Sequence, residues 1–297
     1  MAVRPLIELP LLAAIWGASF IFMKLGGAEF GPILFMALRT LIASVFLVPI
    51  LLLNKQHLNL EGYYLKLFIM AMFSTAIPFI LFGWATLTLT AGITSVLNAT
   101  TPMFGALVAY FWLKDKLSLS AFFGLILGFV GVYFLMYDKL VIAQESVILP
   151  TLAVMLASLC YGISANITKK HLIGVKPIAL ATGSQVSATL VLLPISLFFI
   201  PDEMPSNSAI TSVLLLGVLC TGVAYIIFFR LITFLGPTKA ISVTYLIPVF
   251  GLFWGVVFLN EIITSWMMLG CGFVLTGVAL TTGAIKFKRN KPAPQLN

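Results

Sequence analysis

Ten stretches of about 20 apolar residues follow one another along this chain, joined by short polar links. About 20 consecutive apolar residues form a helix long enough to cross the hydrocarbon core of a bilayer. Only 9% of the 297 residues are charged, against about 25% in a soluble domain. The sequence therefore predicts an all-α membrane protein with ten transmembrane helices, at residues 7–27, 33–53, 66–88, 91–112, 119–137, 147–168, 178–200, 210–233, 239–259 and 264–284.

The fourth and fifth stretches return later in the chain as the ninth and tenth. Without a gap, residues 98–134 align with residues 244–280, at an offset of 146. The matched positions include Pro102 with Pro248, Asp115 with Glu261, Gly124 with Gly270 and Gly131 with Gly277. The first two stretches repeat at an offset of 145, which matches Trp16-Gly17 with Tyr161-Gly162 and Pro32 with Pro177. The chain thus divides into two related halves.

Each half holds five predicted spans, and an odd number makes the second half enter the membrane from the opposite side. We therefore expect inverted repeats, related by a pseudo-two-fold axis in the membrane plane, as in secondary transporters. The predicted units are a first five-helix repeat at 1–146, a second at 147–284, and a basic cytoplasmic tail at 285–297.

The net charge of +8 indicates topology more than a nucleic-acid partner. If the N-terminus is cytoplasmic, fourteen of the seventeen lysines and arginines face the cytoplasm, whereas Lys24 and Lys139 face the other side. This asymmetry agrees with the positive-inside rule and places both termini in the cytoplasm. We expect a multi-pass protein of the inner, cytoplasmic membrane with no nucleic-acid partner.

The residues of most enzyme and cofactor sites are missing from the predicted spans. Both histidines, His57 and His171, lie in loops, and no GxxxxGK[ST] phosphate loop occurs. The three cysteines lie inside predicted helices, as packing residues do. We therefore expect no enzyme activity, no metal and no cofactor.

An ordered set of sequence blocks supports a family assignment. The first half carries IWGASF, PILFMALR, TSVLNATTPMFGALVAYFWLKDKLS and GLILGFVGV, and the second half carries SVTYLIPVFGLFWGVVFLNE and GFVLTGVAL. The set resembles the EamA-type family of the drug/metabolite transporter superfamily over essentially the whole chain. The resemblance implies a ten-helix carrier that exports small metabolites, often amino acids, through a cavity lined by helices 1, 3, 4, 6, 8 and 9. Two positions depart from the family pattern: Asp115 replaces a frequent glutamate, and Ser184 occupies the position equivalent to Arg39.

Arg39 lies about two turns inside the second span, where an ionisable side chain is costly. Three interpretations remain open at this stage. The guanidinium meets a substrate carboxylate, extends to the nearer membrane surface, or ties helix-end carbonyls together. The two structural interpretations together are slightly favoured over substrate contact.

Polar and aromatic residues recur at equivalent positions and form the predicted cavity lining. A lone aromatic residue is more often a packing residue. Because these residues recur at equivalent positions in both halves, cavity lining and ordinary packing are about equally favoured. The candidates are Trp16, Ser19, Arg39, Thr75, Phe79, Phe82, Asn98, Thr101, Tyr161, Thr221, Tyr225, Phe228, Thr244 and Tyr245.

Pro102 and Pro248 predict a kink in the fourth and ninth spans, because proline removes one backbone hydrogen bond. The kink either lets half of each helix move as a gate or is static. Small residues four apart, such as Gly124 and Gly128, allow close helix approach within one chain, so a monomer is favoured.

None of the nine acidic residues lies in the middle of a predicted span. This disfavours a proton-coupled exporter of cations and favours a zwitterionic, neutral or anionic substrate. The sequence therefore predicts a secondary transporter of small metabolites, with amino acids or related compounds as exported substrates and alternating access as the mechanism. The alternatives are a non-transporting membrane scaffold and a flippase for a lipid-linked intermediate.

Overall fold

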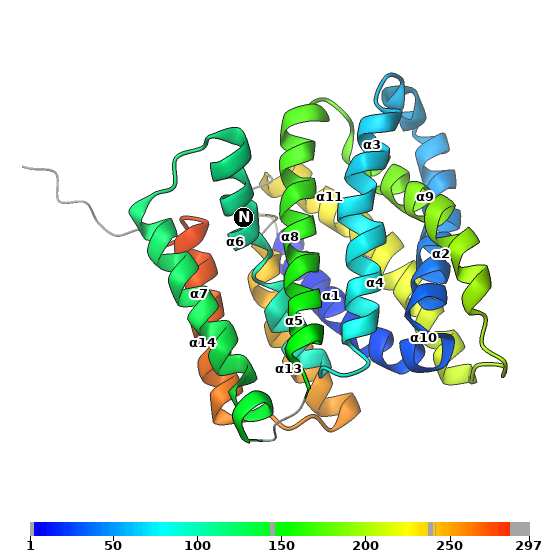
Figure 1. Ribbon diagram of the computed structural model, residues 1–297. Helices are drawn as coiled ribbons and strands as arrows, with labels where there is room; N and C mark the ends of the chain where they lie inside the picture. The colour runs from blue at the N-terminus through cyan, green and yellow to red at the C-terminus, as the bar shows by residue number, and fades with distance from the viewer. Residues whose placement is uncertain (1–2, 143–145, 237–239, 241, 286–297) are drawn as a thin grey trace, which may run out of the picture.

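Helices form all the regular secondary structure of the described chain, which comprises residues 3–142, 146–236, 240 and 242–285 of a computed structural model (Figure 1). The predicted basic tail at 285–297 lies, except for Ile285, outside these residues. In the first half the helices are α1 (Val3–Phe30), α2 (Pro32–Leu53), η1 (Gln56–Leu60), α3 (Tyr64–Ala71), η2 (Met72–Ala76), α4 (Ile77–Ala85), α5 (Ala91–Asn98), α6 (Thr101–Val108), η3 (Ala109–Leu113), α7 (Leu119–Tyr137) and η4 (Asp138–Ile142).

The second half begins at α8 and has a similar order of long helices. Its helices are α8 (Ile148–His171), α9 (Pro177–Ser196), η5 (Leu197–Phe199), α10 (Asn207–Gly217), η6 (Val218–Val223), α11 (Ala224–Leu235), α13 (Val243–Leu259) and α14 (Ser265–Thr281).

Eight helical segments in the described chain are long and apolar enough to cross a bilayer. Two further apolar helices, α13 and α14, have 17 residues each and a length of about 25 Å. Each of these ten segments overlaps one of the ten predicted stretches, although residues 239 and 241 of the ninth lie outside the described residues. The prediction of an all-α membrane protein is confirmed.

The fifth helical segment is longer than predicted. The predicted span ended at residue 137, but the helix continues through η4 to Ile142. The ring of Trp266 in α14 packs against Tyr137, with centroids 4.4 Å apart, and the Thr264 hydroxyl donates a hydrogen bond to the Asp138 carboxylate. These contacts with a distant helix hold the polar residues that lie beyond the predicted span.

Several spans are not continuous α-helices. The third span changes to a π-helical turn at η2, and the eighth span does so at η6, 146 residues later. Pro78 follows the first of these turns and explains the missing α-helical hydrogen bond there, but Ala224 follows the second. The fourth span is interrupted at Ala99 and Thr100, between α5 and α6.

Many helix pairs join the halves, and two of them lie at opposite sides of the fold. On the left of Figure 1, α7 and α14 pack side by side through glycines. A methyl group added at Gly124 would lie 2.6 Å from the Gly277 carbonyl oxygen, and one added at Gly131 would lie 2.9 Å from that of Gly270. At the opposite side α2 packs against α9, where the hydroxyls of Ser44 and Thr189 are 3.2 Å apart.

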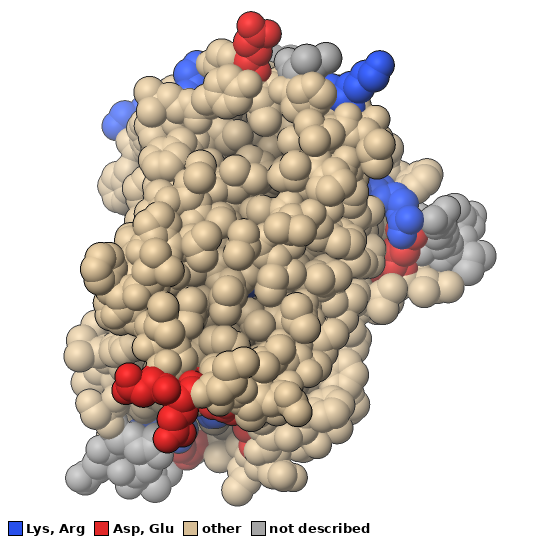
Figure 2. Space-filling view, turned by 90° about the vertical axis from the view of Figure 1, so that its right-hand side faces the viewer, with Lys and Arg blue, Asp and Glu red and all other residues tan. Residues whose placement is uncertain are grey.

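The surface of the described chain is suited to lipid over a wide central band. Figure 2 shows charged side chains mainly at the top and bottom of one face, with uncharged residues covering the band between them. Large apolar side chains such as Phe111, Phe122 and Leu190 are at least half exposed, as expected for groups that contact acyl chains.

Candidate functional site: a cavity between the two halves

A cavity of about 240 Å³ lies where α1, α2, α4, α8, α11 and α13 converge on the break between α5 and α6. This volume is below the ~300–1,000 Å³ of pockets for drug-sized ligands, so the cavity suits a small molecule. Both halves contribute to its lining, which consists of Trp16, Ser19, Phe20, Met23, Arg39, Phe79, Phe82, Asn98, Ala99, Thr101, Pro102, Tyr161, Cys220, Tyr225, Thr244 and Ile247.

Two aromatic pairs at equivalent positions lie at the cavity, and three of their four residues line it. Trp16 packs against Phe228 with ring centroids 5.2 Å apart, and Tyr161 stacks on Phe82 at 5.9 Å. Trp16 and Tyr161 are 145 residues apart in the sequence, and Phe82 and Phe228 are 146 apart, which are the offsets of the repeat. Each pair joins one half to the other, so the cavity walls depend on both halves.

Arg39 brings the one basic side chain into the lining, and its guanidinium is held on two sides. The side chain is only 6% exposed, so it does not extend to the membrane surface. Its Nε donates a hydrogen bond of 3.0 Å to the Thr221 hydroxyl, and its central carbon lies 3.7 Å from the centre of the Phe79 ring. The Nη1 atom is buried and has no hydrogen-bond partner in the described chain.

The π-helical turns place the groups that hold Arg39. The Thr221 hydroxyl accepts from Arg39 and donates to the Leu216 carbonyl oxygen at 2.8 Å, five residues earlier in the chain. A π-turn shifts the backbone register by one residue and often occurs at functional sites. Phe79 follows the first π-turn and Tyr225 follows the second, and both side chains line the cavity.

The break between α5 and α6 lies at the cavity. Asn98, Ala99, Thr101 and Pro102 all belong to the lining. Irregular backbone at membrane depth is tolerated where it lines a cavity, because polar groups there can be hydrated. Pro102 thus lies in the first turn of a new helix, whereas Pro248 lies inside the continuous helix α13.

Ten of the fourteen residues predicted for the cavity lie in this lining, and four lie elsewhere. Thr75 is fully buried and bonds to the Ser74 hydroxyl, 3.2 Å away. Thr221 lies behind Arg39, and Phe228 lies behind Trp16. The Tyr245 hydroxyl forms a hydrogen bond with Thr282 in the last turn region of α14. These four are supporting or distant residues in the structure, not lining residues.

The sequence candidates omitted five lining residues: Phe20, Met23, Ala99, Cys220 and Ile247. Helical spacing carries a signal for two of them, because Phe20 and Met23 follow Trp16 at intervals of four and seven residues. Ala99 and Cys220 line the cavity because the helices are interrupted beside them, and apolar alanine and cysteine give no signal of that in the sequence.

Different contacts join the helices at the two ends of the cavity region. At one end, the Glu261 carboxylate accepts hydrogen bonds from the backbone N–H groups of Ala91, at 2.6 Å, and Gly92, at 3.0 Å. Lys24 donates to the Leu89 carbonyl oxygen nearby, at 3.2 Å. Glu261 therefore caps the first turn of α5 across the fold and joins it to the end of α13.

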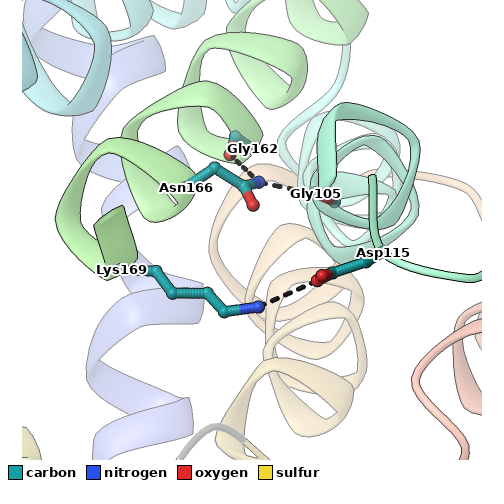
Figure 3. A network of polar contacts seen from close by, with 5 residues as sticks. All are labelled: Gly105, Asp115, Gly162, Asn166 and Lys169. Atoms are coloured by element: carbon teal, nitrogen blue, oxygen red, sulfur yellow. Dashed lines mark hydrogen bonds and ion pairs between the residues drawn. The ribbon is translucent and has the colours of Figure 1, made fainter. Parts of the chain in front are cut away.

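The other end is held by the contacts between α8 and α6 that Figure 3 shows. The Asn166 amide donates to the carbonyl oxygens of Gly105, at 3.0 Å, and Gly162, at 2.8 Å. The Lys169 ammonium lies 2.8 Å from the Asp115 carboxylate, and both side chains are about half exposed or more, at 62% and 49%. Asp115 and Glu261, equivalent in sequence, thus make different contacts.

No group of three His, Cys, Asp or Glu side chains able to hold a metal ion occurs in the described residues. The cavity lining contains no acidic residue. The site therefore offers aromatic faces, a few hydroxyl and amide groups and one cation.

Comparison with known proteins agrees with these features. The chain is 26% identical to an uncharacterized transporter, YoaV, of Bacillus subtilis, over 97% of this chain and 99% of that protein. It is 23% identical to a protein of Escherichia coli named "Probable amino-acid metabolite efflux pump", over 94% of this chain and 95% of that protein.

One solved crystal structure has a similar fold, with a TM-score of 0.66 at 15% identity, over 93% of this chain and 96% of the solved one. The model of the EamA-like transporter family matches this chain twice, at residues 7–137 and again at residues 149–283. The chain therefore belongs to the EamA-like transporter family and is a multi-pass membrane transporter.

Proposed function

We propose that this transporter moves small metabolites, namely amino acids or related compounds, out of the cell by alternating access around the central cavity. The observation that carries the proposal is the position of the cavity between the two halves, with lining residues from both. Secondary transporters bind substrate near the midplane of the membrane, at the interface between repeats. A relative named as an amino-acid metabolite efflux pump supports the substrate class.

Alternating access requires two halves that can exchange roles, and we propose that residues 1–146 and 147–284 are inverted five-helix repeats. Reciprocal contacts support this, because a two-fold axis pairs equivalent residues reciprocally. Gly124 contacts Gly277 while Gly131 contacts Gly270. Ser44 contacts Thr189, its own equivalent 145 residues away, as a residue on such an axis would.

A second set of contacts supports the same relation. A methyl group added at Gly17 would lie 2.9 Å from the Gly251 nitrogen, and one added at Gly162 would lie 2.7 Å from the Gly105 nitrogen. These crossings, of α1 with α13 and of α8 with α6, are equivalent under the repeat offsets. The family model also matches each half separately.

We further propose ten transmembrane spans, a monomer, and both termini on the cytoplasmic side of the inner membrane. The charge distribution supports this orientation: in Figure 2 the basic side chains gather mostly toward the top and the acidic ones mostly at the bottom. The glycines of α7 and α14 are used within the chain, which supports a monomer.

Two alternatives are less well supported. A non-transporting scaffold has no use for a cavity with polar lining groups. A flippase for a lipid-linked intermediate needs an opening from the cavity to the lipid. The apolar groove of about 740 Å³ between α6 and α7, lined by residues such as Tyr110, Phe111 and Phe122, shares no lining residue with the central cavity.

Counterflow into proteoliposomes tests the proposal. Vesicles that contain the purified protein are loaded with one unlabelled amino acid at millimolar concentration, and uptake of the same labelled compound is followed. We expect transient accumulation for a subset of the amino acids, and altered kinetics for Phe79→Ala, whose side chain lines the cavity. Protein-free vesicles are the control. Absence of accumulation across the amino acids and their carboxylate analogues would overturn the proposal.

A further inference from the structure

The guanidinium of Arg39 forms no ion pair with a carboxylate of the described residues. Its Nε is bonded to Thr221, and its flat face lies on the Phe79 ring, at 3.7 Å from the ring centre. The Nη1 atom has no hydrogen-bond partner in the described residues. The side chain is more than nine-tenths buried and belongs to the cavity lining. Arg39 is therefore a buried cation of the cavity lining that keeps unused hydrogen-bonding capacity within the described residues.

Several carboxylates of the described chain are engaged at other places. Glu8 pairs with Arg230, with 2.7 Å between Oε1 and Nη2, and Asp115 pairs with Lys169. Glu29 accepts from Ser206, and Glu261 accepts from the first turn of α5. No acidic residue lines the cavity. A buried cation without a counter-charge is costly, so it indicates a ligand that supplies the charge.

We propose that Arg39 binds the carboxylate of the transported molecule and thereby selects carboxylate-bearing compounds over amides and amines of the same shape. This inference rests on the proposed function and specifies its substrate class. A guanidinium is a planar group whose paired N–H donors match the geometry of a carboxylate. The contacts of Arg39 with Phe79 and Thr221 fix the plane of these donors.

The rest of the lining defines the remainder of the ligand. Six aromatic side chains line the cavity: Trp16, Phe20, Phe79, Phe82, Tyr161 and Tyr225. These side chains suit a ligand whose remaining part, apart from the carboxylate, is aromatic or aliphatic. Arg39 is the one basic residue of the lining, so a single negative charge is matched and a phosphate dianion is not. Ser184 occupies the equivalent position in the second half, which gives the cavity one carboxylate site and a defined ligand orientation.

A labelling assay measures the charge of the site even while the transported compound is unidentified. Thr101→Cys is introduced into a variant in which Cys160, Cys220 and Cys271 are alanines, because Thr101 lines the cavity and is partly exposed. The rates of reaction with anionic and cationic methanethiosulfonates of similar size are compared. We expect the ratio of anionic to cationic rates to fall about tenfold or more on Arg39→Met, and to be kept in Arg39→Lys.

Protection from labelling then tests the ligand class. The probes share one phenyl body: L-phenylalanine, 3-phenylpropanoate, 3-phenylpropanamide and 2-phenylethylamine, with inorganic phosphate as a further anion. We expect the two carboxylates to slow labelling and the other three to have no effect. Arg39→Met should raise the half-protecting concentration of 3-phenylpropanoate about 30-fold or more. Thr221→Val, which removes the hydrogen bond to Nε but keeps the charge, should retain the preference for carboxylates.

The outcomes separate the two proposals. Equal protection by the amide, the amine or phosphate, no protection by either carboxylate, or an unchanged preference in Arg39→Met, would overturn the carboxylate site. Loss of the preference in Thr221→Val to the same extent as in Arg39→Met would show that Arg39 is structural, which also overturns it. Carboxylate protection without counterflow would overturn the proposed transport and leave the site. Counterflow without a charge preference would overturn the carboxylate site and leave the proposed transport.

Discussion

Glu261 and Asp115 occupy equivalent positions in the two halves, and the structure predicts opposite consequences for their removal. The Glu261 carboxylate accepts from two backbone N–H groups, of Ala91 and Gly92, at 2.6 and 3.0 Å. Asp115 instead makes an exposed ion pair with Lys169. We expect Glu261→Ala to destabilise the protein clearly, and Asp115→Ala to change its stability little.

The magnitudes follow from these contacts. A hydrogen bond to a charged acceptor contributes about 1.5–3 kcal/mol, and loss of a helix N-cap costs about 0.5–2 kcal/mol. Because Glu261 is only partly buried, water replaces part of each bond, so we expect a loss of about 2–3 kcal/mol. An exposed ion pair such as that of Asp115 contributes about 0.2–1 kcal/mol.

Thermal unfolding of the detergent-purified variants, followed by size-exclusion chromatography after heating, is the measurement. We expect the midpoint to fall by about 4–8 °C in Glu261→Ala and by about 2 °C or less in Asp115→Ala. Glu261→Gln should lie between, because its amide oxygen still accepts one of the two bonds. Equal shifts for both alanine variants, or a smaller shift for Glu261→Ala, would refute the assignment of Glu261 as the cap of α5.

Three further predictions use other contacts. Gly277→Val should lower the yield of monodisperse protein, because the added group would lie 2.6 Å from a backbone oxygen of α7 and such overpacking costs about 1–3 kcal/mol, whereas Gly272→Val, with open space beside it, should not. Glu8→Leu and Arg230→Met should each lower the free energy of unfolding by about 1–3 kcal/mol, seen as a lower unfolding midpoint, and the double variant should recover most of that loss. Additive losses in the double variant would contradict a direct ion pair. Tyr225→Ala should change counterflow kinetics with a midpoint within about 2 °C of the wild type, and unchanged kinetics would argue against its place in the substrate cavity.

The fold class and most of the lining follow from local patterns in the sequence. Stretches of about 20 apolar residues require helices in lipid, because no water is present to satisfy the backbone. Helical spacing places Trp16, Ser19 and Met23 on one face of α1, and all three line the cavity. The repeat identifies Phe82 and Phe228 as equivalent, but only the first lines the cavity, since the second packs behind Trp16.

The partners of the charged groups depend on residues far away in the chain. The sequence left three interpretations of Arg39 open, and its contacts with Thr221 and Phe79 exclude extension to the membrane surface. Glu8 and Arg230 are 222 residues apart, and no local pattern links them. Such pairs are set by how helices cross, which depends on side-chain packing across the whole fold.

The sequence by itself determined the helical membrane class and several faces of the helices, because these depend on apolar runs and on helical periodicity, and its ordered blocks indicated the family. Only the tertiary structure decided the π-turns at η2 and η6 and the break before Pro102. The π-turn at η6 forms without a proline, so packing and the bonds of Thr221 compensate for its altered backbone register. The cavity lies beside the turn at η6 and the break before Pro102, and lining residues of both halves, Arg39 among them, meet there because of how the helices pack.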